Sequence, residues 1–317
     1  MKRLASLLGR IFPLMAALAA SSVWAASPTP ADAKSRPADV PQHYVVTPFG
    51  YFHPSCVTEV SDGARLEDAD ISSACVNRPH YDAQGKVAAA TGAAMPPPRA
   101  GAALAAINGW VEDSELVASS PYAGISASWL VPAAPASRGG QVVYFFPGLQ
   151  DSHNVQSILQ PVLGWNAFSD QAWTIASWNC CKNGAANYSA PRKVASGDWI
   201  TGRVWHDCAA GAISCGSWNV ETRDATQNIQ TTLSHTSNYG QSFNWAFGGV
   251  LEVYSVANCQ NYPADGALSF SNIQLLDINK QIISNPAALA WRANVLQQGG
   301  GCNYHAAAAK TVTTLSY

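Results

Sequence analysis

The sequence predicts an all-β protein built as a sandwich of two antiparallel sheets. Charged residues make up only 12% of the 317-residue chain, which argues against helical bundles and coiled coils, since both depend on Glu and Lys. The chain is instead rich in Trp, Gly and Pro, with 11, 24 and 19 residues respectively. From about residue 107 onward, short runs rich in Val, Ile, Trp, Tyr and Thr are separated by Gly, Asn, Ser and Pro, as in the strands and turns of a sandwich.

Several segments have this character, and each is expected to form a strand. They are residues 125–131, 141–146, 157–163, 172–178, 199–205, 217–222, 250–256 and 267–276. One helix is expected near the C-terminus, over residues 287–297. Asn285 would cap it, Pro286 would lie in its first turn, and Gly299 would end it.

The N-terminus, residues 1–26, predicts a secretory signal peptide. Lys2, Arg3 and Arg10 precede an apolar run over residues 11–20, and small residues follow. The run is short for a membrane span, so we expect no membrane contact after cleavage; an uncleaved anchor is the alternative. Cleavage removes three basic and no acidic residues, which changes the formal charge from −2 to −5 and argues against a nucleic-acid partner.

All eight cysteines lie beyond this peptide, and an even number in an exported chain predicts disulfides. Spacing suggests the pairs Cys56–Cys75, Cys208–Cys215 and Cys259–Cys302, with Cys180 and Cys181 either paired to each other or each bound elsewhere. Zinc is the alternative, but the sequence has neither a CxxC nor an HExxH motif, so no metal and no cofactor are expected.

Residues 27–104 form a distinct first section, and residues 105–317 form the predicted sandwich domain. The section ends in an Ala/Gly/Pro tract over residues 88–106, which has the composition of a linker. A small segment, residues 44–81, precedes the tract. It could be a propeptide that covers an active site until the linker is cut, or an accessory subdomain.

Glu252 is the most informative acid in the β region. It lies within the apolar run 250–256, where alternation places it on one strand face with Val250 and Tyr254. Either this face is solvated or it lines a cleft. In an aromatic cleft, burial would raise the pKa of the carboxyl and suit it to acid–base chemistry.

Gln160 is a similar polar residue among apolar neighbours. Ile158 and Val162 share its face of the strand, and Pro161 predicts an edge strand or a bulge. The amide could be a hydrogen-bonded core group or a polar group held for a ligand.

Other catalytic patterns are weaker. The sequence has no GxSxG motif, and Ser214 to Trp218 resembles the nucleophile segment of thiol peptidases, although Cys215 is expected in a disulfide. A paired-carboxylate site would need a second strand acid beside Glu252. The candidates Asp198, Glu221, Asp224 and Asp277 each lie near a turn or a strand end.

A series of short motifs runs through the β region in a fixed order. It comprises Gly109-Trp110-Val111, Tyr122 to Pro132, Phe146 to Gln150, Ile158-Leu159-Gln160, Ala172 to Trp178, Ala195 to Ile200 and Leu251-Glu252-Val253-Tyr254. In this order the segments resemble the glutamic peptidases of the eqolisin family, across roughly residues 107–280. The neprosin peptidases, which use two Glu, are a more distant resemblance.

The resemblance implies a concanavalin-A-like jelly roll, a propeptide, action at acidic pH, and Gln160 and Glu252 as the catalytic pair. The candidate substrate-binding residues are Phe146, Gln150, Trp165, Trp178 and Tyr254. Supporting acids of the family are replaced here by Gln150, Gly164, Ser177 and Val256. These replacements imply an altered pH dependence, another substrate, or a sandwich that only binds.

We therefore expect a secreted or periplasmic, monomeric endopeptidase of glutamic type that acts on polypeptides. Glu252 would activate the attacking water, and Gln160 would stabilise the oxyanion. The alternative is a sandwich that binds or cleaves polysaccharides. The peptidase hypothesis requires Gln160 and Glu252 to point into one cleft from adjacent or facing strands, within one water of each other.

Overall fold

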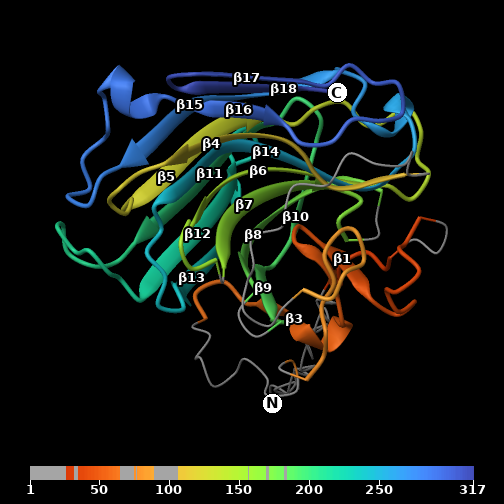
Figure 1. Cartoon of the computed structure of the whole chain (residues 1–317), viewed down its shortest axis with the longest axis horizontal. Coiled ribbons are helices and arrows are strands. Elements are labelled where there is room, and N and C mark those ends of the chain that lie inside the picture. The colour runs from red at the N-terminus through yellow and green to blue at the C-terminus, as the bar shows by residue number, and fades with distance from the viewer. Residues whose placement is uncertain are drawn as a thin grey trace, which may run out of the picture.

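The computed structural model describes residues 26–31, 35–64, 75, 77–88, 106–155, 157–168, 171–181 and 184–317. The predicted signal peptide, apart from Ala26, and most of the Ala/Gly/Pro tract lie outside these residues. Two large sheets face each other (Figure 1), and this arrangement confirms the expected all-β sandwich. Within the described ranges, no helix has both the length and the apolar character needed to cross a membrane.

The larger sheet has nine strands. In spatial order they are β16 (Arg292–Val295), β4 (Ile107–Val117), β14 (Trp245–Val256), β6 (Val142–Gln150), β7 (Ile158–Trp165), β8 (Trp173–Cys180), β9 (Ala186–Ser189) and β3 (Val57–Val60), with β10 (Arg192–Val194) paired to β8. All of these pairings are antiparallel except that of β3 with β9.

The smaller sheet has seven strands. In spatial order they are β13 (Ile229–Ser237), β12 (Ser217–Asp224), β11 (Trp199–His206), β5 (Gly124–Leu130), β15 (Ala267–Leu276), β18 (Val312–Ser316) and β17 (His305–Ala309). Every strand segment expected from the sequence overlaps an observed strand.

The main hydrophobic core fills the space between the two sheets. Phe145 and Leu163 enter it from the larger sheet, and Trp129 and Val204 enter it from the smaller one. Gly202 on β11 allows the two sheets to approach each other closely at the centre, because a Cβ atom at this position would lie 2.6 Å from the ring of Pro161 on β7. The expectation that Pro161 marks an edge strand is wrong, since β7 lies between β6 and β8. The β6–β7 register is interrupted opposite Pro161, so the ladder accommodates a residue without an N–H.

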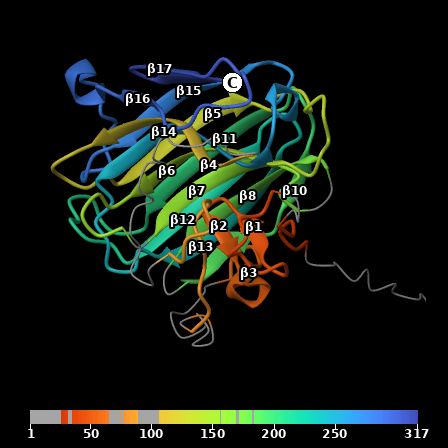
Figure 2. The same ribbon diagram turned by 45° about the vertical axis from the view of Figure 1, so that its right-hand side comes forward.

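A second hydrophobic cluster lies on the opposite face of the larger sheet. This surface, which we call the covered face, carries Tyr144, Phe146, Val162, Trp178 and Val250 on β6, β7, β8 and β14. The N-terminal section packs against it. Figure 2 shows this section, in red and orange, lying against the larger sheet.

The N-terminal section contacts the sheet in two ways. A hairpin of β1 (Val45–Thr47) and β2 (Gly50–Phe52) contributes Val46, Phe49 and Tyr51 to the second cluster. Farther along, β3 extends the edge of the larger sheet by pairing with β9. The section is thus both a cover and an added edge strand.

The expected C-terminal helix is wrong beyond its first turn. Asn285 does cap a turn, because its side chain accepts a hydrogen bond from the Ala287 amide at 3.0 Å. That turn is a short 3₁₀ helix, Pro286–Leu289, and the chain then becomes strand β16, which pairs with β4. Pairing at the sheet edge and the bond from Arg292 to Glu115 override the local helical pattern.

The four disulfides confirm the pairing that the spacing suggested. The bonds are Cys56–Cys75, Cys180–Cys181, Cys208–Cys215 and Cys259–Cys302, and no cysteine is free.

Candidate active site

Glu252 lies on β14 and its side chain belongs to the covered face. Val250 and Tyr254, its alternate neighbours, are both in the second cluster, and Glu252 itself is 0% exposed. The Tyr254 hydroxyl donates to Glu252 Oε1 at 2.5 Å, while Oε2 has no hydrogen-bond partner among the described residues. Burial raises the pKa of Glu252 to about 8, against the opposing effects of the Tyr254 hydroxyl and the nearby Trp110.

Gln160 lies on β7 and faces the same way as Ile158 and Val162, which both belong to the second cluster. It is 0% exposed, and neither its amide nitrogen nor its amide oxygen has a partner in the described part of the chain. A buried polar group without a partner costs about 1–3 kcal/mol. The fold therefore retains a costly amide on this face, which is typical of a group that bonds a ligand when the face is open.

The two residues share a face but are not neighbours. Strand β6 lies between β14 and β7. On β6, Glu252 is opposite Tyr144, whereas Gln160 is beside Gly148, whose added Cβ would lie 3.5 Å from Gln160 Cγ. Tyr144 and Gly148 are four residues apart on β6, which corresponds to ~13 Å along the strand. The expectation of adjacent or facing strands, with the two groups within one water of each other, is therefore wrong, and the two groups occupy different positions along the covered face.

Four of the five candidate substrate-binding residues lie near this surface. Phe146, Trp178 and Tyr254 are buried in the second cluster, and Trp178 pairs with Gln160 across β7 and β8. Gln150 is partly exposed at the end of β6. The expectation for Trp165 is wrong: it lies in the core between the sheets, because its odd position on β7 turns it away from the face of Gln160.

The hairpin of the N-terminal section packs on the two tyrosines beside Glu252. The Tyr51 ring meets the Tyr254 ring edge to face, with centroids 5.3 Å apart. The Tyr144 hydroxyl donates to the Val46 carbonyl oxygen at 3.4 Å, a long hydrogen bond. At the other end of the hairpin, Phe49 packs against Trp178 with centroids 6.1 Å apart. The hairpin thus runs along the covered face, from strand β1 beside Tyr144 to its turn, where Phe49 lies beside Trp178.

Sequence reasoning missed Tyr144, which is opposite Glu252 on β6 and fully buried. It also missed three buried acids on β4. Burial raises the pKa of Glu112 to about 7 and that of Asp113 to about 7, while Glu115 binds Arg292 and the Trp245 indole. Acids in a run such as Glu112-Asp113-Ser114-Glu115 suggest an exposed strand. The structure shows instead that β16 side chains bind Asp113 and Glu115, whereas Glu112 lies beside the backbone of β17 and β18.

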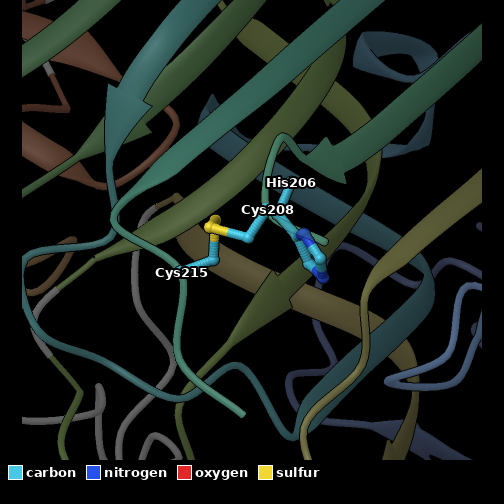
Figure 3. A group of neighbouring side chains, drawn as sticks. All are labelled: His206, Cys208 and Cys215. Atoms are coloured by element: carbon cyan, nitrogen blue, oxygen red, sulfur yellow. A yellow bond between two sulfur atoms is a disulfide. The ribbon is translucent and has the colours of Figure 1, made fainter. Parts of the chain in front are cut away.

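One group of side chains in the described residues has the spacing of metal ligands. His206, Cys208 and Cys215 place their ligand atoms within 4.8 Å of one another. Figure 3 shows that the two sulfur atoms are joined in a disulfide. Because thiolates are the form of cysteine that binds metals, the disulfide leaves one imidazole to act as a ligand.

No protein-family model and no curated protein sequence matches the chain. Among solved structures, it is similar to scytalido-glutamic peptidase bound to a peptide-based transition-state analogue, with 14% identity and a TM-score of 0.49. It is also similar to SCP-B, a member of the eqolisin family in complex with the tripeptide Ala-Ile-His, with 16% identity and a TM-score of 0.48. Both matches cover 67% of this chain and 99% of the other. At this level of similarity, function has to be inferred from the side chains of the chain itself.

Proposed function

We propose that the chain is an exported endopeptidase in which Glu252 is the acid–base group. The observation that carries the proposal is the hairpin on the covered face: its extended strand β1 contacts Tyr144, which lies directly opposite the fully buried Glu252. A surface that already holds backbone of its own chain has the shape to hold backbone of a substrate. Glu252 is buried and has no cationic partner among the described residues, and burial of this kind raises the pKa of a carboxyl into the range of acid–base catalysis.

The catalytic step needs an ionised Glu252. Water that enters when the hairpin leaves would lower the pKa of Glu252 from its raised value toward 4.5, because desolvation is the main cause of the shift. Ionised Glu252 would then take a proton from water as the water attacks the scissile carbonyl. The same residue would return the proton to the leaving nitrogen.

Gln160 has a different role from the one that the resemblance implies. Its offset of ~13 Å along the strands separates it from the water that Glu252 would activate. Its amide offers donors and an acceptor, the groups needed to bind the backbone of an extended peptide. We assign it to substrate binding, about four residues from the scissile bond, beside Trp178.

The first section acts as a propeptide in this proposal. Both Glu252 and Gln160 are fully buried while the section is in place, so substrate can reach them only after it moves. The predicted signal peptide and four disulfides support export.

The test is an assay of the purified full-length protein on denatured protein substrate at acidic and neutral pH, before and after cleavage within residues 88–106. We expect activity at acidic pH after cleavage, resistant to chelators and to serine- and thiol-directed reagents. Glu252→Gln should abolish it. Full activity of Glu252→Gln would refute the proposal, and activity found only on uronate-containing glycans would favour the polysaccharide alternative.

A further inference from the structure

We propose that Tyr144 is the oxyanion donor of this site and that the Val46 carbonyl marks the position of the scissile carbonyl. The inference rests on the proposed function, because it assigns a further catalytic residue to the same reaction. Tyr144 would then be the oxyanion donor in place of Gln160, which lies too far along the strands from Glu252.

The first support is the register of β6 and β14. Tyr144 and Glu252 are directly opposite each other, and both side chains belong to the covered face. Directly opposed residues of antiparallel strands have Cβ atoms about 5 Å apart. A substrate group lying over this pair would therefore contact the phenol and the carboxyl together.

The second support is the contact with the hairpin. The Tyr144 hydroxyl donates to the main-chain carbonyl of Val46 at 3.4 Å, within the extended strand β1. The hydroxyl of Tyr254 is engaged with Glu252 Oε1. Of these two phenols beside Glu252, Tyr144 is the one that points its donor at a peptide carbonyl.

The third support is the protonation state of the phenol. Burial and the nearby Glu252 carboxyl hold the pKa of Tyr144 well above its usual value. Tyr144 therefore keeps its proton throughout the pH range of the reaction and remains a hydrogen-bond donor. A donor that already points toward the carbonyl needs no reorganisation when charge develops on the oxygen.

The reaction balances without a cofactor. Glu252 takes one proton from water, the water oxygen bonds to the carbonyl carbon, and the C=O π electrons move to the oxygen, which accepts a hydrogen bond from Tyr144. When the C=O bond reforms, the C–N bond breaks and the nitrogen takes the proton from Glu252. Tyr144 neither gains nor loses a proton.

The test compares Tyr144→Phe with Tyr188→Phe in the full chain, after cleavage within residues 88–106. Both substitutions remove a hydroxyl that donates to a main-chain carbonyl. Tyr144 donates to Val46, and Tyr188 donates at 2.9 Å to Ala26, the last residue of the predicted signal peptide. Tyr144→Phe should lower kcat roughly 100-fold, the typical loss for one oxyanion donor, with KM within about threefold. Tyr188→Phe should leave both constants unchanged.

A kcat for Tyr144→Phe within about threefold of wild type, with Glu252→Gln inactive, would overturn the inference and leave the proposed function intact. Activity in Glu252→Gln would instead refute the proposed function. If Tyr144→Phe does not fold, fluorotyrosine at position 144 keeps the hydroxyl and changes its acidity. In that case kcat should change with phenol acidity, and an unchanged kcat would count against the role of Tyr144.

Discussion

Replacing Glu252 by Gln should abolish activity and, at the same time, stabilise the fold at neutral pH. The pKa of Glu252 is raised from 4.5 to about 8 by burial, so the folded state holds the carboxyl neutral where the unfolded state ionises it. The free energy of unfolding therefore has its full value below pH 4.5, and it falls as the pH rises from 4.5 toward 8. At about 1.4 kcal/mol per pH unit, the loss reaches roughly 3 kcal/mol at pH 7.

Gln mimics the protonated glutamate and keeps an oxygen that can accept from Tyr254, so the variant should escape this loss. Urea unfolding with disulfides intact should give equal stabilities at pH 4 and a variant more stable by roughly 3 kcal/mol at pH 7. Glu115→Gln is the matched control: Glu115 binds Arg292 and Trp245, so its replacement should destabilise the fold at pH 7. Equal stability of wild type and Glu252→Gln at pH 7 would show that Glu252 is solvated.

Three further outcomes are expected. Incubation at acidic pH should cut the chain within residues 88–106 and raise activity; a fully active uncut chain by mass spectrometry would make the first section an accessory subdomain. Burial lowers the pKa of His80 to about 4, so His80→Gln should slow hydrogen exchange of residues 44–52 at pH 4 relative to wild type and change it little at pH 7. Burial raises the pKa of Asp224, which shares a hydrogen bond with Asp198, so Asp224→Asn should raise the melting temperature more at pH 7 than at pH 4; a shift independent of pH would contradict this.

The strands and the disulfides could be predicted because their signals are local. Alternation within 125–131 or 250–256 reports which residues a strand buries, and short spacing favours Cys208–Cys215. Strand β13 was missed because Ser, Thr, Gln and His fill most of its positions, and it is recognisable only by its pairing with β12.

The site could be predicted only in part, because local alternation shows which face a residue lies on but not which strands are neighbours. Alternation correctly places Glu252 with Val250 and Tyr254, but it does not reveal how far apart two strands lie in a sheet. The position of β6 between β7 and β14 is a property of the topology, and it separates Gln160 from Glu252. The same topology brings Tyr144, which has no distinguishing sequence context, opposite the glutamate.

We expect that cleavage of the predicted linker, rather than acid alone, is needed to open the covered face. Protonation of His80, whose pKa is about 4 when buried, opposes docking of the section below pH 6.5. Burial of Glu252, whose pKa is about 8, has the opposite effect, because acid neutralises the carboxyl that the section covers. Between pH 6.5 and 4.5 the two effects oppose each other, so we expect a fall in pH over this range to change the docking free energy little.

Cleavage would act on the effective concentration of the section rather than on protonation. The disulfide of the section, Cys56–Cys75, lies within it, and the other three bonds lie within residues 180–302, so no disulfide ties the section to the sandwich. While the linker is intact, the section faces the covered face of the larger sheet at an effective concentration on the order of millimolar. Once the linker is cut, that concentration falls to that of the protein in solution. Dilution can then release the hairpin from Tyr144 and Glu252, and the released face is the one that a peptide substrate would occupy.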